Sequence, residues 1–326
     1  MTASPGTARS DPDQPGTGPE PRTPGSLGAE LRRMLAAGDL DLPVPGRDGP
    51  EALTRRWAAL SRWGRRDLAL ARLAEGHADA VAILAEAGLH PEPLALYGVW
   101  AAKSGGTGAA WGEDGLRGTV RFCSGLTGLD RALVVAGEHL VEVDLTAPGI
   151  ERHPEAWQSV GMDASDSGDV RFEGVPATEV GPPGWYVARP GFVLGGTGVA
   201  AVWLGGAAGL LDAVCEYLRP RADEHQLAHL GALHTAVRGS EELLRSTAAV
   251  IERSAEPGLL NATCRASVEH TAREVVDRAP RITGPALLCR DRRFAQHLAD
   301  LQVFIRQHHA ERDLAALGRG VLEQRA

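Results

Sequence analysis

The chain has 326 residues, of which 43% are hydrophobic, and its 34 basic and 42 acidic side chains give a formal charge of −8. A chain of this length and composition can bury a sizeable core, which excludes disorder throughout. The acidic balance argues against a nucleic-acid partner, because the phosphate backbone is bound through clustered Lys and Arg.

Four scattered cysteines indicate a reducing compartment, because they form no C-x-x-C pair and no disulfide framework. No uninterrupted, strongly apolar run approaches the about 18 residues that a membrane-spanning helix needs. The N-terminus lacks the basic start and apolar run of a secretory signal. We therefore expect a cytoplasmic protein without a membrane partner.

The N-terminal residues 1–26 are dominated by Pro, Gly, Ser, Thr and Asp. This composition predicts a disordered tail, since it offers too little apolar surface to bury. Helical spacing begins at Leu27 and Leu31, and Gly38 is a plausible stop. The fold is therefore expected to start with a short helix.

A reduced helical region is expected over residues 27–92. Asp48 is a candidate N-cap, and amphipathic spacing follows it as far as the Gly-Leu-His-Pro breaker at residues 88–91. Two helices fit this stretch, with a break near Gly64.

Residues 93–190 predict a small β-domain, because the hydrophobic period shortens and glycine becomes frequent. Residues 137–138 suit a tight hairpin between two of the strands. We expect an antiparallel barrel or sandwich. The predicted strands are residues 117–123, 132–136, 139–145 and 169–172.

Residues 191–320 return to helical periods, interrupted by short Pro and Gly breakers that are typical of an up-and-down bundle. The fold class predicted for the whole chain is α+β: N-terminal helices, a central antiparallel β-domain and a C-terminal four-helix bundle. The four predicted helices are residues 194–217, 224–254, 259–279 and 291–317.

Two stretches of the β-domain resemble one family. Residues 161–175 read GMDASDSGDVRFEGV, which is similar to the G-M-R-A-S-x-T/S-x-x-V-x-F-x-x-V stretch of acyl-CoA dehydrogenases. Residues 118–125 read GTVRFCSG and, with Asp130 after them, resemble the family's G-x-K-x-W-I-T-N-x-x-x-A-D stretch. The order of helices, β-domain and bundle agrees with this resemblance.

The resemblance implies an FAD cofactor between the β-domain and the bundle. Ser124 falls where the family's Thr hydrogen-bonds flavin N5, and Phe122 falls where its Trp lines the ring. Val99 and Trp100 fall at the strand that touches the pyrimidine side of the ring. A hydroxyl beside N5 is chemically sensible, because hydrogen bonds there tune the atom that accepts hydride.

The resemblance also implies a homodimer or homotetramer. Arg221 matches an Arg that grips FAD phosphate across a subunit interface, a role that suits the paired donors of a guanidinium. Thr283 and Gly284 fall where a Gly-rich turn meets the partner's FAD.

Departures from the family concern mainly catalysis. The T-E-P-x-x-G-S-D segment is replaced by WAAKSGG at residues 100–106, and no Glu stands at either known place of the catalytic base. Desaturation needs a carboxylate to remove the proton alpha to the thioester. Asp300 is one position from the expected base, and His297 could instead approach the flavin, as polar residues do in monooxygenase relatives of this fold.

Other chemistries are weaker. Adjacent His308 and His309 point about 100° apart on a helix and cannot readily share a metal ion, and the pair at residues 225 and 229 lacks a third ligand. The G-x-G-x-x-A at residues 196–201 resembles a dinucleotide fingerprint, but no β-α-β unit surrounds it. Small residues there suit close helix packing instead, and no metal is expected.

The sequence thus predicts an FAD-dependent oxidoreductase that acts on an acyl thioester, such as a CoA thioester, or a related small molecule, and passes electrons to an acceptor. Two alternatives stay open. The chain could be a flavin-dependent monooxygenase of the same fold, or a non-catalytic scaffold subunit. The short N-terminal region, in which the family builds part of its acyl pocket, makes a substrate other than a plain fatty acyl-CoA plausible.

Overall fold

The computed structural model describes residues 22–102 and 108–325. The first helix, α1 (Pro24–Ala37), starts inside the predicted tail, because Thr23 and Ser26 form a reciprocal capping box and Pro24 occupies the first turn. The predicted tail is therefore too long, and residues 1–21 lie outside the described residues. Gly38 ends α1 in the left-handed conformation, as predicted.

Two further helices, α2 (Ala52–Arg66) and α3 (Leu68–Glu86), complete the N-terminal region. The predicted pair is confirmed, but the break lies at Asp67, whose side chain caps α3, and Glu51 rather than Asp48 precedes α2. Gly64 lies inside α2, where any Cβ would overlap the carbonyl oxygen of Val202. It is a helix-crossing point and not a breaker.

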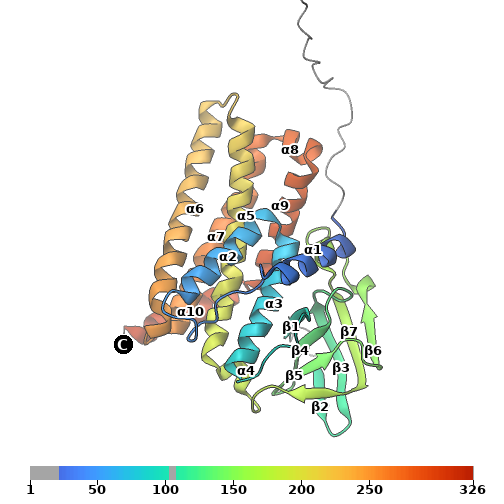
Figure 1. The fold of residues 1–326 in the computed structure, drawn as a ribbon. Helices are drawn as coiled ribbons and strands as arrows, with labels where there is room; N and C mark the ends of the chain where they lie inside the picture. Colours follow the sequence, from blue (N-terminus) through green and yellow to red (C-terminus); the bar gives the residue numbers. More distant parts are fainter. Residues whose placement is uncertain (1–21, 103–107, 326) are drawn as a thin grey trace, which may run out of the picture.

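An eight-stranded sheet follows the helices, and Figure 1 shows it curled at one end of the molecule. Its strands run in the order β6-β7-β3-β2-β4-β5-β8, with β1 paired to β4. The predicted antiparallel pairing is found for most of the sheet, whereas β1 and β2 each pair with β4 in parallel. The strands are β1 (Tyr97–Trp100), β2 (Ala109–Gly112), β3 (Gly115–Cys123), β4 (Arg131–Ala136), β5 (His139–Asp144), β6 (Ile150–His153), β7 (Gly168–Val175) and β8 (Ala177–Glu179).

The C-terminal bundle starts after the short α4 (Trp185–Ala188). Three long helices agree with the predicted ones, but the predicted helix over residues 291–317 is divided. It ends in a 3-10 turn at Ile305–Gln307 and resumes after Ala310, which has a positive φ of 43°. The bundle helices are α5 (Pro190–Leu218), α6 (Glu224–Val250), α7 (Pro257–Thr283), α8 (Pro285–Arg290), α9 (Arg292–Phe304) and α10 (Glu311–Gln324).

Helix α5 is the central helix of the bundle and packs against α2, α3, α6, α7 and α9. By length and composition alone it could cross a membrane, although the sequence predicts no such helix. Its most apolar window is 72% buried inside the protein. Glycines let α2 approach closely, since a Cβ on Gly205 would overlap the Ser61 carbonyl oxygen. The apolar character of α5 thus serves the core.

The sheet has its own core, which helices α1 and α3 close. Leu27 and Leu31 of α1 and Leu70 and Leu73 of α3 pack in one cluster with residues of the sheet. A separate cluster joins α2, α5, α6, α7 and α9. The loop before β7 reaches the bundle, because a Cβ on Gly161 would overlap the carbonyl oxygen of Ala299 in α9. The junction of sheet and bundle therefore lies at this loop.

Candidate functional site

Two loops of the sheet are tied together at this junction. Asp166 accepts hydrogen bonds from the Thr127 amide and hydroxyl, at 2.6 and 2.8 Å, and from the Gly128 amide at 3.2 Å. The Gly125 amide donates to the Ser165 carbonyl at 3.1 Å. Ser124, at the end of β3, is thereby fixed against the loop before β7.

A chain of hydroxyl groups ends at Ser124. The Ser165 hydroxyl donates to the Met162 carbonyl at 2.6 Å and lies 2.7 Å from the Ser167 hydroxyl. Ser167 in turn donates to the Ser124 oxygen at 3.0 Å. Because each hydroxyl carries one hydrogen, the hydrogen of Ser124 has no acceptor among the described residues. The half-buried Ser124 can therefore donate to a ligand.

An exposed aromatic side chain lies two residues before Ser124. Phe122 is 55% exposed and has a positive φ of 57°, an uncommon backbone conformation for a bulky residue. Its ring lies edge-on to Trp157 with 6.5 Å between ring centroids. The Trp157 indole nitrogen donates to the Met162 carbonyl at 3.2 Å. The junction thus presents an aromatic surface next to a free hydroxyl donor.

The two residues predicted on β1 take supporting positions. Trp100 is 2% exposed, and its indole nitrogen donates to the Ser124 carbonyl at 3.0 Å. Its ring therefore positions Ser124 and is not open to a ligand. Val99 is half-buried and packs against the cluster that contains Tyr97 and Leu133.

The residues predicted to meet a partner's cofactor lie together at one end of the bundle. Gln226, at the start of α6, donates to the Ile282 carbonyl at the end of α7 at 2.9 Å, which brings Arg221 and Gly284 to the same end. Figure 1 shows that the α5–α6 connection lies away from the sheet. Gly284 has a φ of 57° and open space where a Cβ would be.

Arg221 and Thr283 differ in their availability to a ligand. Arg221 is exposed and forms no ion pair with a described residue. Thr283 is buried, and its hydroxyl donates to the Ala279 carbonyl at 3.2 Å. The Thr283 hydroxyl therefore uses its hydrogen within α7, and the contact of this turn with a partner's cofactor stays a prediction.

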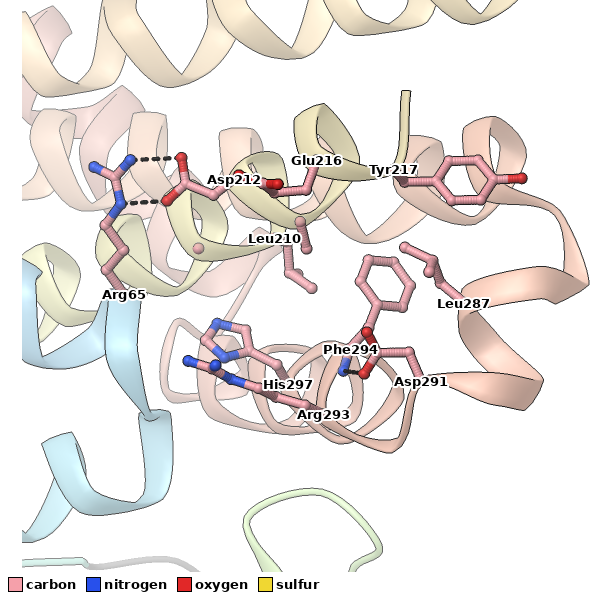
Figure 2. A pocket seen from close by; sticks show the side chains of 12 residues that line it. Arg65, Leu210, Asp212, Glu216, Tyr217, Leu287, Asp291, Arg293, Phe294 and His297 are labelled. Atoms are coloured by element: carbon pink, nitrogen blue, oxygen red, sulfur yellow. Dashed lines mark hydrogen bonds and ion pairs between the residues drawn. The ribbon is translucent and has the colours of Figure 1, made fainter. Parts of the chain in front are cut away.

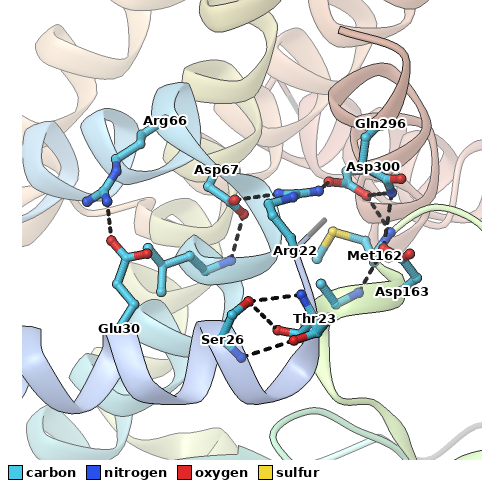
Figure 3. A network of polar contacts seen from close by, with 12 residues as sticks. Arg22, Thr23, Ser26, Glu30, Arg66, Asp67, Met162, Asp163, Gln296 and Asp300 are labelled. Carbon is cyan, nitrogen blue, oxygen red and sulfur yellow. Dashed lines mark hydrogen bonds and ion pairs between the residues drawn. The ribbon is translucent and has the colours of Figure 1, made fainter. Parts of the chain in front are cut away.

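Asp300 does not have the geometry of a catalytic base. It is 0% exposed, and Figure 3 shows its carboxylate surrounded by donors. Arg22 donates to it at 2.6 Å, the Met162 amide at 2.6 Å and Gln296 at 2.9 Å. The hypothesis that Asp300 removes a substrate proton is corrected accordingly, because a base needs an accessible lone pair within reach of the substrate. Asp300 joins α9 to the loop before β7 and to the N-terminal segment.

His297, one turn before Asp300, faces α5 instead. Its Nε2 lies 2.9 Å from the Gly206 carbonyl, and burial lowers the pKa of the imidazole. The ring lies at the wall of a cavity of about 490 Å³ that residues of α2, α5, α8 and α9 line (Figure 2). The predicted cofactor-binding residues do not line this cavity. The structure therefore separates His297 from Phe122 and Ser124.

The remaining candidates are distributed through helices. Within residues 22–102 and 108–325, no three His, Cys, Asp or Glu side chains are grouped as metal ligands would be. The segment from Phe192 to Ala201 lies wholly within α5, so the strand that a dinucleotide fingerprint requires is absent there. Residues 103–107, which replace most of a family motif, lie outside the described residues.

Comparison with known proteins supports the fold. Residues 183–305 match the family model described as acyl-CoA dehydrogenase, C-terminal domain. A search of curated proteins by sequence gives no match.

Solved structures match over almost the whole chain. The complex of the dibenzothiophene monooxygenase TdsC from Paenibacillus sp. A11-2 with FMN and indole is 17% identical, with a TM-score of 0.73 over 92% of this chain and 95% of that one. Methanesulfinate monooxygenase MsuC from Pseudomonas fluorescens is 20% identical, with a TM-score of 0.75 over 92% and 96%. Butyryl-CoA dehydrogenase from Megasphaera elsdenii is 17% identical, with a TM-score of 0.73 over 90% and 89%.

The helices, the curled sheet and the C-terminal bundle together form the acyl-CoA dehydrogenase fold. The bundle helices α5 to α9 fall within residues 183–305, which match the model of the C-terminal domain of acyl-CoA dehydrogenases. Sequence reasoning missed Trp157, Ser165 and Ser167 as parts of the junction. The two serines lie inside the motif that carried the resemblance, but only the folded loop reveals that they orient Ser124.

Proposed function

We propose that the chain is a flavin-dependent oxidoreductase that holds the isoalloxazine ring at the junction of sheet and bundle. The observation that carries this proposal is the chain of hydroxyls from Ser165 through Ser167 to Ser124, which leaves the Ser124 hydrogen free. A flavin offers N5 as a hydrogen-bond acceptor and supplies redox chemistry that side chains lack. The exposed ring of Phe122 provides an apolar contact for a planar ligand.

The reaction we propose is of the monooxygenase kind. Desaturation of an acyl thioester requires a base that removes the alpha proton. Asp300 is fully buried and ion-paired, and His297 faces another cavity, so neither meets this need at the junction. Two similar structures, TdsC and MsuC, are named as monooxygenases, which supports oxygen-dependent chemistry on a small molecule. Acyl-thioester dehydrogenation is the second candidate, and the family match of the bundle favours it.

The cofactor we propose is FAD, shared between two copies of the chain. Arg221 belongs to the α5–α6 connection and Gly284 directly precedes α8, and both places lie at the end of the bundle away from the sheet (Figure 1), so a partner must bring its own pair to the flavin phosphates. Arg221 is exposed and unpaired among the described residues, as a phosphate ligand must be before binding. A homodimer is the smallest assembly that satisfies this requirement.

Flavin binding by the purified full-length chain tests the proposal. Titration with FAD and with FMN, followed through visible absorbance and quenching of flavin fluorescence, should reach one flavin per chain. The bound flavin, once chemically reduced, should be reoxidised by O2, whereas acyl-CoA thioesters should not reduce the oxidised form. Failure to bind either flavin would contradict the proposal and favour a scaffold subunit that assembles with a catalytic relative.

A further inference from the structure

The cavity beside His297 lies apart from the proposed flavin junction. It is formed between α5 and α9, with Arg65 at the end of α2 and Leu287 of α8 at its edges (Figure 2). None of its lining residues comes from the sheet. Its volume of about 490 Å³ is in the range of small-molecule sites, which run from about 300 to 1,000 Å³.

His297 presents a fixed hydrogen-bond acceptor to this cavity. Its Nε2 must carry the ring hydrogen, because the partner at 2.9 Å is the Gly206 carbonyl, which only accepts. Nδ1 is therefore a lone pair. Nδ1 has no hydrogen-bond partner among the described residues. It is not fully enclosed by protein atoms, so it remains accessible at the cavity wall. Burial lowers the pKa of this imidazole, which keeps it neutral.

One of the two arginines in the lining forms no ion pair with a described residue. The Asp212 carboxylate accepts hydrogen bonds from Nε and Nη2 of Arg65, at 2.5 and 2.6 Å. Asp291 caps α9 by accepting from the Phe294 amide at 3.0 Å, and Glu216 pairs with Arg219 at 2.9 Å. Of the two lining cations, Arg293 is the one that has no ion-pair partner in the described part of the chain, and Asp291 is the one lining carboxylate that accepts only from a backbone amide.

Apolar side chains form the rest of the cavity. Leu210, Ala213, Leu287 and Phe294 line it between the polar groups. Such a lining, with a few convergent polar groups, is typical of sites for small organic ligands. The acceptor selects a ligand that carries an N–H or O–H group, and the free guanidinium selects a negative charge.

We infer that the α5–α9 cavity is a second binding site, which takes a small organic anion with an apolar ring system and a hydrogen-bond donor. Arg293 binds the anionic group, Nδ1 of His297 accepts from the donor, and Leu210 and Phe294 contact the rings. The inference uses no residue of the proposed flavin junction.

Anilinonaphthalene sulfonate is a suitable probe, since it combines a sulfonate, an aniline N–H and fused rings, and its fluorescence rises on binding. The full-length chain should bind one dye molecule per chain in a saturable titration. Arg293→Gln should raise the Kd about tenfold, because a charge-assisted contact is lost, and Arg293→Lys should recover part of the affinity. Arg292→Gln is the matched control, since Arg292 is an exposed neighbour on the same helix and does not line the cavity.

Two further measurements test the proposed binding site between α5 and α9. Ala213→Trp should fill the cavity and abolish dye binding while the far-ultraviolet circular dichroism stays unchanged. The nitrogen NMR signal of His297 Nδ1 should shift on dye binding, as expected for a new hydrogen bond. Unchanged dye affinity in Arg293→Gln, or no saturable binding, would overturn the inference. Displacement of the dye by FAD or FMN would also overturn it, because the flavin would then occupy this cavity. Weaker flavin binding in Ser124→Ala with unchanged dye affinity would support two separate sites.

Discussion

The guanidinium of Arg22 and the carboxylate of Asp300 lie 2.6 Å apart, although 278 positions separate them in the chain. Arg22 also forms an ion pair with Asp67 at 2.5 Å (Figure 3). Asp67 caps α3, and Asp300 receives the Met162 amide, so one arginine connects the N-terminal segment, α3, α9 and the loop before β7. These contacts hold the loop that orients Ser124.

Removal of Arg22 should therefore destabilise the fold. Arg22→Ala leaves Asp300 as a buried carboxylate without its cation, and breaking buried pairs in this way costs about 3 kcal/mol. Urea unfolding should show this loss as a lower midpoint. Arg33→Ala, an exposed change on α1, should stay within about 0.5 kcal/mol of the parent. Equal stability of both variants would show that the ion pair contributes nothing.

Substitution of Ser124 should weaken flavin binding. Ser124→Ala removes the only hydroxyl hydrogen of the Ser165–Ser167–Ser124 chain that is free to donate, and a hydrogen bond of this kind contributes about 1 kcal/mol, or roughly fivefold in Kd. Flavin fluorescence titration measures the change, and Ser124→Thr should restore affinity. Ser246→Ala, on the exposed face of α6, is the control. Parent affinity in Ser124→Ala would remove Ser124 from the flavin site.

Substitution of Arg221 should weaken the binding of FAD but not the binding of FMN. If the partner's Arg221 binds the distal part of FAD, Arg221→Gln raises the Kd for FAD about tenfold and leaves the Kd for FMN unchanged. Arg219→Gln is a close control, because Arg219 lies in the same segment but pairs with Glu216. Light scattering should show an oligomer that retains flavin. A monomer that binds stoichiometric FAD would contradict the shared site.

His77 should make stability depend on pH. Its Nδ1 accepts the Tyr97 amide at 3.1 Å, and burial lowers the pKa of His77 to about 4 from the ordinary value of 6.5. Between these values the unfolded chain binds a proton that the folded chain does not, so the stabilising contribution is complete above pH 6.5 and falls by about 3 kcal/mol as the pH drops to about 4.

The difference between parent and variant isolates this contribution. Unfolding free energies measured from pH 7.5 to 4 should fall more steeply in the parent than in His77→Gln, which cannot titrate. Parallel curves would show that His77 is already protonated or plays no part in the acid response.

The glycines between α2 and α5 should tolerate no side chain. Gly205→Ala places a Cβ against the Ser61 carbonyl and should cost about 1 to 3 kcal/mol through helix displacement. Gly231→Ala on α6 meets open space, so it should be neutral or stabilise by up to about 1 kcal/mol. Thermal unfolding of the two variants compares these effects directly. A stabilised Gly205→Ala variant would disprove the close crossing.

The order of the elements follows from the amino-acid sequence alone. Periodicity placed α5, α6 and α7 nearly to their ends, and Gly38 marked the end of α1, because apolar spacing and terminating residues act locally along the chain. Periodicity did not reveal β2, β6 and β8, whose short segments acquire strand structure only by pairing with neighbours, and β1 was expected only from the family resemblance. The parallel pairing of β1 with β4 is likewise a long-range property.

What the candidate site residues can do depends on contacts that form only in the folded protein. A motif identified Ser124, but only the loop contacts show that its hydroxyl hydrogen is free. Asp300 stands near the position of a catalytic base in the sequence, yet Arg22 from the other end of the chain neutralises and buries it. His297 shares its helix but faces α5. Spacing along a helix determines which face a side chain occupies. The residues that contact this face come from distant parts of the chain, so the chemical environment of the side chain is set only on folding.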